Sequence, residues 1–336
     1  NPKKKGNIKS RFNIGSKKIN LNQFIFEEDK NKIKVKNLKI LNKSFHKLDD
    51  INIVTFNDGI ENNNFRISFR DKILIKGKKY DSSYLLKQLS GKKHNFLEKI
   101  NKKIEIKFEN IITKSSVPLY NFNLLGVIEK GKFIKINSKS EFSDNKYLDI
   151  SLDKDGENKK ILEIYSDLPK ALLSDFKFFE GIKDGKLLYT SVISETSSKS
   201  KLLIEDFKIL KAPKFATLLT LADLGGVADL LSGDGISFDL LEVDLLDDDN
   251  TTTINEVLAI GPSISVLMDG YVEKKTKLVS LRGTMVPAKN LNKLISKIPV
   301  VGDILVGKKL GEGIFGISFK IKGPPGKLKT SVNPVK

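Results

Sequence analysis

The residues able to carry out bond chemistry are scarce in this chain of 336 residues. It has no cysteine and only two histidines, His46 and His94, both in lysine-rich surroundings. Without cysteine there is no thiolate nucleophile and no thiolate metal site, and two isolated histidines suit neither a Ser-His-Asp triad nor a histidine-rich zinc site. We therefore expect a protein that is not an enzyme, with no catalytic residue and no cofactor or metal site.

Two glycine-rich segments match the spacing of phosphate-binding loops. Residues 126–132 place glycine and lysine as a P-loop does, but Phe133 stands where serine or threonine would ligate magnesium. Residues 311–316 match the G-x-G-x-x-G spacing of dinucleotide-binding folds. Both run into strand patterns, whereas either motif needs a helix whose N-terminus faces the phosphate. We predict a β-hairpin turn at the first segment and a bulge or tight bend at the second.

An acidic run, Asp247-Asp248-Asp249-Asn250, raises the question of calcium binding. It lacks the spacing and the central glycine of an EF-hand loop, so the sequence favours a solvated turn between strands.

The net charge of +18 is uneven along the chain. Residues 1–165 carry 36 Lys and Arg against 20 Asp and Glu, a net +16, and residues 166–336 carry 23 against 21, a net +2. The excess of lysine over arginine, with abundant asparagine and isoleucine, is typical of AT-rich coding sequence. The functional alternative is attraction to phosphate groups of lipid or nucleic acid. The asymmetry predicts two domains, 1–165 and 166–336.

The elements that must position any site are mostly strands. Ile33 and Val35 alternate with Lys32, Lys34 and Lys36, and the same two-residue period recurs along the chain. This period is typical of strands with one wet face, and roughly fifteen such runs predict a mainly β, antiparallel fold. Turn signals separate the runs: Asn57-Asp58-Gly59, Lys130-Gly131, Asp155-Gly156 and Asp184-Gly185.

Helical patterns are few, and four are predicted at residues 84–89, 168–179, 214–231 and 288–298. The last two have alternative roles, as caps over the open end of the sheet or as a gate where a ligand leaves. Their apolar positions are Leu218, Leu221, Leu291, Leu294, Ile295 and Ile298. No run of 18 apolar residues predicts a transmembrane helix, and the start without methionine or signal peptide suggests a fragment of a longer protein.

An ordered series of C-terminal motifs resembles the AsmA-like proteins of bacterial envelopes, in particular the YhdP-type branch. The sequence LRGTMVPA at 281–288 and the segment 207–239, which ends in LSGDGISF at 231–238, belong to this series. Its other parts are residues 291–295, 298–305, 311–316 and 323–334. The resemblance is specific over 165–336 and loose over 1–165.

The resemblance implies a fold and a function. Members of the AsmA–TamB superfamily look like elongated, curled antiparallel β-sheets that form an open, taco-like groove, here with short helices capping the C-terminal part. Residues 1–165 would then be a basic, β-rich groove segment and 166–336 an AsmA-like C-terminal region. The expected partners are phospholipid and the membranes at the ends of the full-length protein, without nucleic acid. The expected location is the periplasm of a Gram-negative envelope, with an inner-membrane anchor outside this fragment.

The residues that would line such a groove alternate along strands of the C-terminal half. They are Leu187, Tyr189, Ile193, Leu203, Phe207, Ile209, Phe315, Ile317, Phe319 and Ile321. In an open groove these side chains would contact acyl chains, and in a closed sandwich they would contact a second sheet. Alternation alone does not separate the two arrangements, and the resemblance favours the groove.

Three functions remain open from the sequence. The first is transport of phospholipid between inner and outer membranes along an apolar β-groove, which needs no catalytic residue. The second is a structural or assembly factor for outer-membrane biogenesis that carries no lipid. The third, which we rank lowest, is a basic nucleic-acid-binding module in 1–165, because the lysines alternate along strands without a stacking-aromatic motif.

Overall fold

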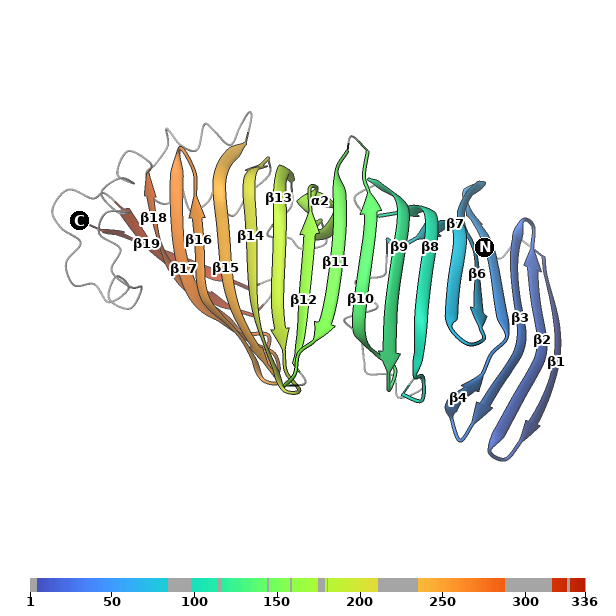
Figure 1. Cartoon of the computed structure of the whole chain (residues 1–336). Coiled ribbons are helices and arrows are strands. Elements are labelled where there is room, and N and C mark those ends of the chain that lie inside the picture. Colours follow the sequence, from blue (N-terminus) through green and yellow to red (C-terminus); the bar gives the residue numbers. More distant parts are fainter. Residues whose placement is uncertain are drawn as a thin grey trace. The chain divides into compact units, whose positions relative to one another are not determined.

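The computed structural model describes residues 5–83, 98–113, 117–143, 145–157, 159–174, 179, 181–210, 235–287, 316–324 and 327–335. Twenty strands and one short helix make up the secondary structure of this part (Figure 1). The predicted mainly β fold with a curled, open antiparallel sheet is confirmed. The chain forms two compact units, residues 1–157 and 158–336, whereas the charge asymmetry placed a boundary near residue 165.

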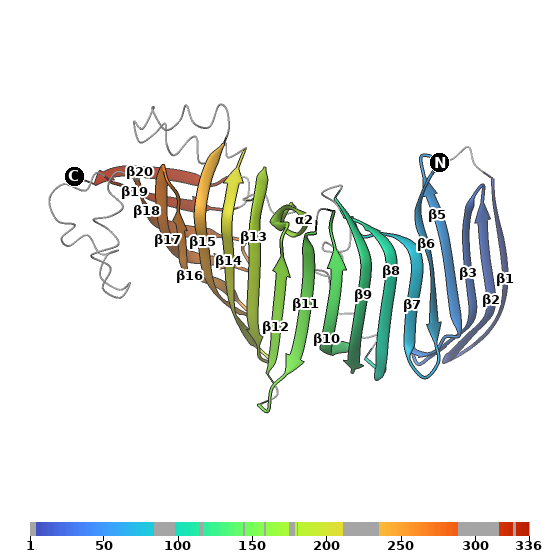
Figure 2. The same ribbon diagram turned by 45° about the horizontal axis from the view of Figure 1, so that its top comes forward.

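Unit 1 is a layer of strands that lie side by side (Figure 2). Hydrogen bonding runs in the order β1-β2-β3-β5-β6-β7-β8-β9-β10-β11, with the short β4 also paired to β3. The pairings are antiparallel except for β7 with β8, which is parallel. The strands are β1 Gly6–Gly15, β2 Lys18–Glu28, β3 Asn31–Leu41, β4 Ser44–Lys47, β5 Asp50–Asn57, β6 Ile60–Phe69, β7 Ile73–Asp81, β8 Lys102–Ile112, β9 Pro118–Glu129, β10 Lys132–Glu141 and β11 Tyr147–Lys154.

Unit 2 is a meander in which β12 to β20 pair in sequence order, all antiparallel. Its strands are β12 Lys160–Ser166, β13 Ile182–Ile193, β14 Ser197–Ile209, β15 Ile236–Asp248, β16 Thr251–Ile260, β17 Ile264–Glu273, β18 Val279–Pro287, β19 Gly316–Gly323 and β20 Lys329–Val335. Helix α2, Pro169–Leu173, begins with proline in its first turn, where the missing N–H is not needed. It lies within the helix predicted at 168–179 and is shorter.

The P-loop-like segment is a hairpin, as predicted. Gly126 belongs to β9, and Lys130 and Gly131 turn the chain into β10 with φ of 48° and 72°. Two consecutive residues of positive φ make the tight turn whose twist matches the flanking strands. The acidic run is also a turn, because Asp248 ends β15 and accepts the backbone N–H groups of Asn250 and Thr251, both at 2.8 Å.

The prediction of a turn at Asp184-Gly185 is wrong, because these residues lie inside β13. Their φ angles are 59° and 89°, and Asp206 on the paired β14 has a φ of 51°. A Cβ on Gly185 would come within 2.8 Å of Phe207 Cβ, so glycine is required there. The ladder keeps one register through this point, since Lys186 pairs with Glu205 and Asp184 with Phe207, so neither strand gains a residue. The positive φ angles break the two-residue alternation on both strands instead, because the buried residues are Leu187 and Ile182 on β13 and Ile204 and Phe207 on β14.

Candidate functional site

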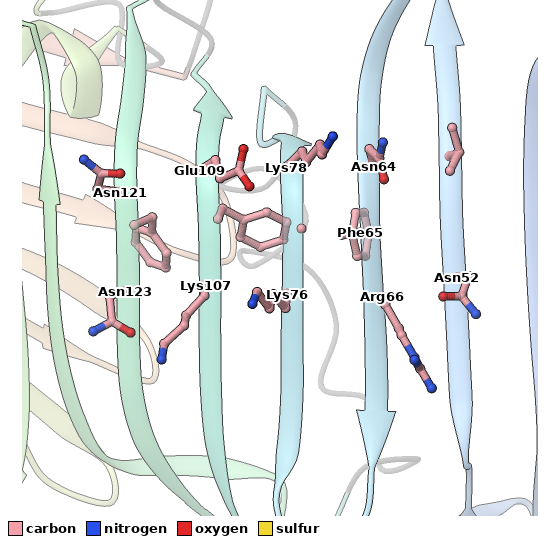
Figure 3. Close-up of a pocket in the computed structure, with 14 residues that line it drawn as sticks. Asn52, Asn64, Phe65, Arg66, Lys76, Lys78, Lys107, Glu109, Asn121 and Asn123 are labelled. Atoms are coloured by element: carbon pink, nitrogen blue, oxygen red, sulfur yellow. The ribbon is translucent and has the colours of Figure 1, made fainter.

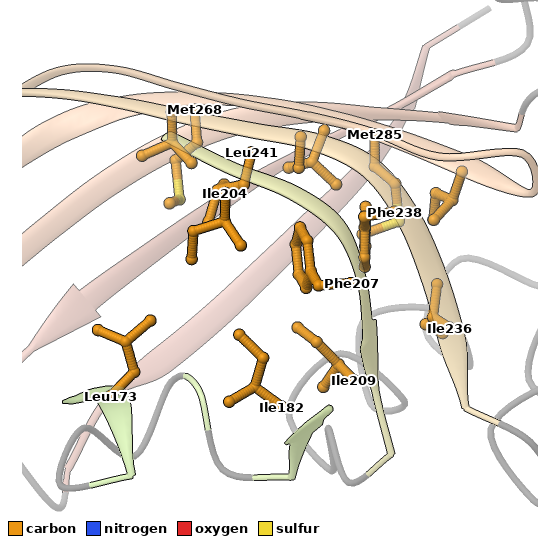
Figure 4. Packing of buried hydrophobic residues seen from close by; sticks show 14 of the residues in the cluster. Leu173, Ile182, Ile204, Phe207, Ile209, Ile236, Phe238, Leu241, Met268 and Met285 are labelled. Carbon is orange, nitrogen blue, oxygen red and sulfur yellow. The ribbon is translucent and has the colours of Figure 1, made fainter. Parts of the chain in front are cut away.

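Unit 2 buries its apolar face in one cluster. Side chains of β13 to β19 and of α2 point toward one another inside the curled sheet (Figure 4). Ile204 and Ile264 are fully buried, Met285 is 1% exposed, and the Phe207 and Phe238 rings stack with centroids 5.3 Å apart. These side chains pack against one another and have little exposed surface, as in an ordinary close-packed core.

The predicted lining residues of unit 2 therefore lie mainly in this core. Leu187, Phe207, Ile209 and Phe319 belong to the cluster, Tyr189 and Ile321 pack against it, and Ile317 is buried. Ile193 is half-buried and lies at the end of β13, outside the cluster. Phe315 and the six residues of the predicted cap or gate helices, Leu218, Leu221, Leu291, Leu294, Ile295 and Ile298, lie outside the described residues, as does the helix predicted at 84–89.

Leu203 was predicted to share a face with Phe207 and Ile209, and this is wrong. Leu203 pairs with Leu188 and Glu242, whereas Ile204 pairs with the buried Leu187 and Leu241. The positive φ of Asp206 breaks the two-residue alternation, so Ile204 and Phe207, three residues apart, are both buried in the core. Sequence alternation alone had no signal for this break.

Unit 1 presents a different apolar surface, which consists of two continuous rows that cross its strands. Strand pairing places the members of each row directly opposite one another, on the same face. Row A is Ile8, Phe26, Ile33, Ile53, Phe65, Gly77, Phe108 and Phe122. Row B is Phe24, Val35, Ile51, Ile67, Ile75, Ile106 and Leu124.

Rows A and B stay partly open to solvent over β1 to β6. Ile8 is 65% exposed, and the apolar side chains of both rows on β2, β3, β5 and β6 are half-buried. Toward the other end a small cluster forms, in which Ile73, Ile104 and Leu124 are buried. The alternation Lys32-Ile33-Lys34-Val35-Lys36 already indicated an apolar and a basic face in this part of the chain. The lining residues predicted from the sequence all lie in unit 2, and rows A and B were not predicted.

The chain matches no protein-family model, and neither the curated proteins nor the solved structures contain a match to it. The resemblance to AsmA-like proteins consequently stays a prediction.

No group of three or more His, Asp or Glu side chains among the described residues could hold a metal ion, and His46 is exposed on β4. No helix of the described part is long and apolar enough to cross a membrane. His94 lies outside the described residues.

One carboxylate on the basic face has a strongly shifted pKa. Glu105 accepts hydrogen bonds from Lys107, at 2.6 Å, and from Lys72, and these two lysines lower its pKa to about 2. Because the folded state lowers this pKa, the ion pairs stabilise the fold fully above pH 4.5, and the stabilisation declines as the pH falls toward 2.

A carboxyl-carbon NMR titration of Glu105 tests this assignment. The expected midpoint is near pH 2, and Lys72→Gln with Lys107→Gln should move it back toward the ordinary value of 4.5. Lys139→Gln on β10 serves as the control and should leave the midpoint in place. A wild-type midpoint near 4.5 would show that neither lysine holds the carboxylate in solution.

Proposed function

We propose that the chain is a non-enzymatic lipid-binding segment of an envelope protein, in which the apolar face of unit 1 holds the acyl chains of phospholipid. The observation that carries the proposal is the pair of apolar rows, A and B, which are only half-buried across β2, β3, β5 and β6. Continuous apolar surface that the protein leaves partly uncovered is typical of a binding surface.

The dimensions of the rows fit acyl chains. Neighbouring strands are about 4.8 Å apart, so row A, which crosses eight strands, extends about 34 Å. The hydrocarbon core of a bilayer is about 30 Å thick, so one acyl chain is about 15 Å long and crosses three or four strands. Each row offers the length of about two chains in series.

The energetics explain why such a protein needs no catalytic residue. Transfer of a methylene from an apolar environment to water costs about 0.8 kcal/mol, so a phospholipid with two long chains faces a cost on the order of 20 kcal/mol in water. A continuous apolar surface removes much of that cost by contact alone. Movement from the inner to the outer membrane along the surface, as the resemblance to AsmA-like proteins implies, is part of the proposal.

The closed core of unit 2 favours a second, structural role for that half. Leu187 and Phe207 are each 2% exposed, so they contact protein and present little surface to a ligand. We infer that unit 2 serves as a folded support, as in the alternative function of an assembly factor for outer-membrane biogenesis. In this arrangement acyl-chain binding belongs to unit 1.

Lipid extraction and photolabelling test the proposal. The protein, purified without harsh detergent, should carry phospholipid at a near-stoichiometric ratio by mass spectrometry. A phospholipid with a photoreactive acyl chain should label peptides of β2 to β6 and leave those of β13 to β15 unlabelled. Lipid-free protein that also takes up no labelled phospholipid would reject lipid binding and favour the structural role of the whole chain. Labelling centred on unit 2 would contradict the assignment to unit 1.

A further inference from the structure

A shallow hollow lies on the face of unit 1 opposite to rows A and B. Its volume is about 550 Å³, within the range of small-molecule sites, about 300–1,000 Å³. On β5 it is lined by Asn52 and Val54 but not by Ile53 between them, and no residue of row B lines it. Because side chains alternate between faces, the hollow opens on the basic face, with the backbone of row A as its floor.

Two rows of side chains, polar apart from Val54, flank that floor (Figure 3). One row runs through Asn52, Arg66, Lys76, Lys107 and Asn123, which strand pairing places directly opposite one another. The other side carries Val54, Asn64, Lys78, Glu109 and Asn121. The lining therefore combines four cations, one carboxylate and four asparagine amides, a net charge of +4 − 1 = +3.

The cations are arranged in a way that costs stability. Arg66, Lys76 and Lys107 occupy the same register position on three adjacent strands, and like charges directly opposite are destabilising. The parallel pairing of β7 with β8 brings Lys76 beside Lys107. Asp50 holds Arg66 at 2.7 Å and Glu105 holds Lys107 at 2.6 Å, and both acids lie outside the lining. These ion pairs fix Arg66 on β6 and Lys107 on β8. Lys76 and Lys78 lie on β7 between those two strands, on either side of Gly77.

We propose that this hollow binds the phosphate of a phosphorylated polyol, such as a phosphoglycerol group. Lys76 and Lys78 supply charge-assisted hydrogen bonds to the phosphate oxygens, and Arg66 and Lys107 add to the positive field. The asparagine amides carry both donors and acceptors, which suits neighbouring hydroxyl groups. The single carboxylate of the lining, Glu109, accepts hydrogen bonds from a hydroxyl but repels phosphate, which places the phosphate toward the Lys76 side.

The site is separate from acyl-chain binding, because its side chains lie on the other face of the sheet. The phosphorylated polyol has two possible sources, a lipid headgroup at a membrane surface and a free soluble compound. The experiment below distinguishes them and does not depend on the outcome of the lipid extraction.

Titration of the whole chain with sn-glycerol 3-phosphate, followed by isotope-edited NMR, tests the site. Saturable shifts are expected for amides of β6 to β9, with weaker binding of inorganic phosphate and none of glycerol. Lys76→Gln with Lys78→Gln should weaken glycerol phosphate binding about tenfold or more. The matched control, Lys9→Gln with Lys139→Gln, removes the same charge from the same face outside the lining and should leave binding unchanged.

Vesicles of phosphatidylcholine with and without phosphatidylglycerol identify the source. Binding to phosphatidylglycerol vesicles that is lost in Lys76→Gln with Lys78→Gln and is displaced by glycerol phosphate assigns the site to a headgroup. Binding of glycerol phosphate without vesicle binding assigns it to a soluble compound. The proposal is overturned by an absence of saturable binding, by an equal loss in the control pair, or by preferred binding of single-stranded DNA across the whole face.

Discussion

Replacing Ile204 by alanine is expected to lower the free energy of unfolding of unit 2 by about 2–5 kcal/mol, because the side chain is fully buried and leaves a cavity. Leu203→Ala, one residue earlier on β14, should cost about 1 kcal/mol or less, because Leu203 is half-buried on the opposite face. Two adjacent aliphatic residues thus differ severalfold in their contribution, and the break in alternation at Asp206 decides which one contributes more.

Urea unfolding followed by hydrogen exchange of the amides in β13 to β15 measures both costs. The register supports the expected order, since Ile204 is paired with Leu187 and Leu241, which are 2% and 3% exposed. Asp206→Ala provides a further check, because alanine adopts the φ of 51° found there less readily than aspartate does. Equal costs for Ile204→Ala and Leu203→Ala, or a larger cost for Leu203→Ala, would show that β14 keeps a regular alternation.

The fold class followed from the sequence because strand alternation is a local property. Ile33 and Val35 between lysines require one apolar and one basic face wherever the strand pairs. The same reasoning failed at Leu203, because residues of positive φ at Gly185 and Asp206 break the alternation without inserting a residue. Asp184-Gly185 carried the composition of a turn, and the same composition also supplies positive φ inside a strand.

The candidate sites were less accessible to prediction, because they depend on pairing between distant strands. Ile33 stands between two lysines and is half-buried, whereas Ile204 ends the apolar run 202–204 and is fully buried. The difference comes from the curl of unit 2, which brings other strands over Ile204. The hollow near Lys76 depends on the parallel register of β7 with β8, for which the sequence of either strand has no signal.

The second large effect is expected in unit 1, where Ile51→Asp with Ile67→Asp should weaken acyl-chain binding more than about 100-fold. Ile51 and Ile67 face each other across β5 and β6 in row B. An aspartate in contact with hydrocarbon costs about 2.5–3.5 kcal/mol, and two such residues interrupt the row at its centre. Binding of an uncharged fluorescent long-chain acyl probe to the whole chain measures the loss.

The matched control is Asn52→Asp with Asn64→Asp, which adds the same charge to the same two strands on the basic face. It should leave acyl-chain binding within about twofold of the wild type, because alternation keeps these side chains away from rows A and B. Circular dichroism and the thermal midpoint establish that each variant folds, and Ile51→Ser with Ile67→Ser replaces the aspartate pair if that pair unfolds. Because the two aspartate pairs alter net charge equally, a difference between them is not an effect of net charge. An equal loss in both pairs would place acyl-chain binding elsewhere in the chain and would remove the main support for lipid carriage by unit 1.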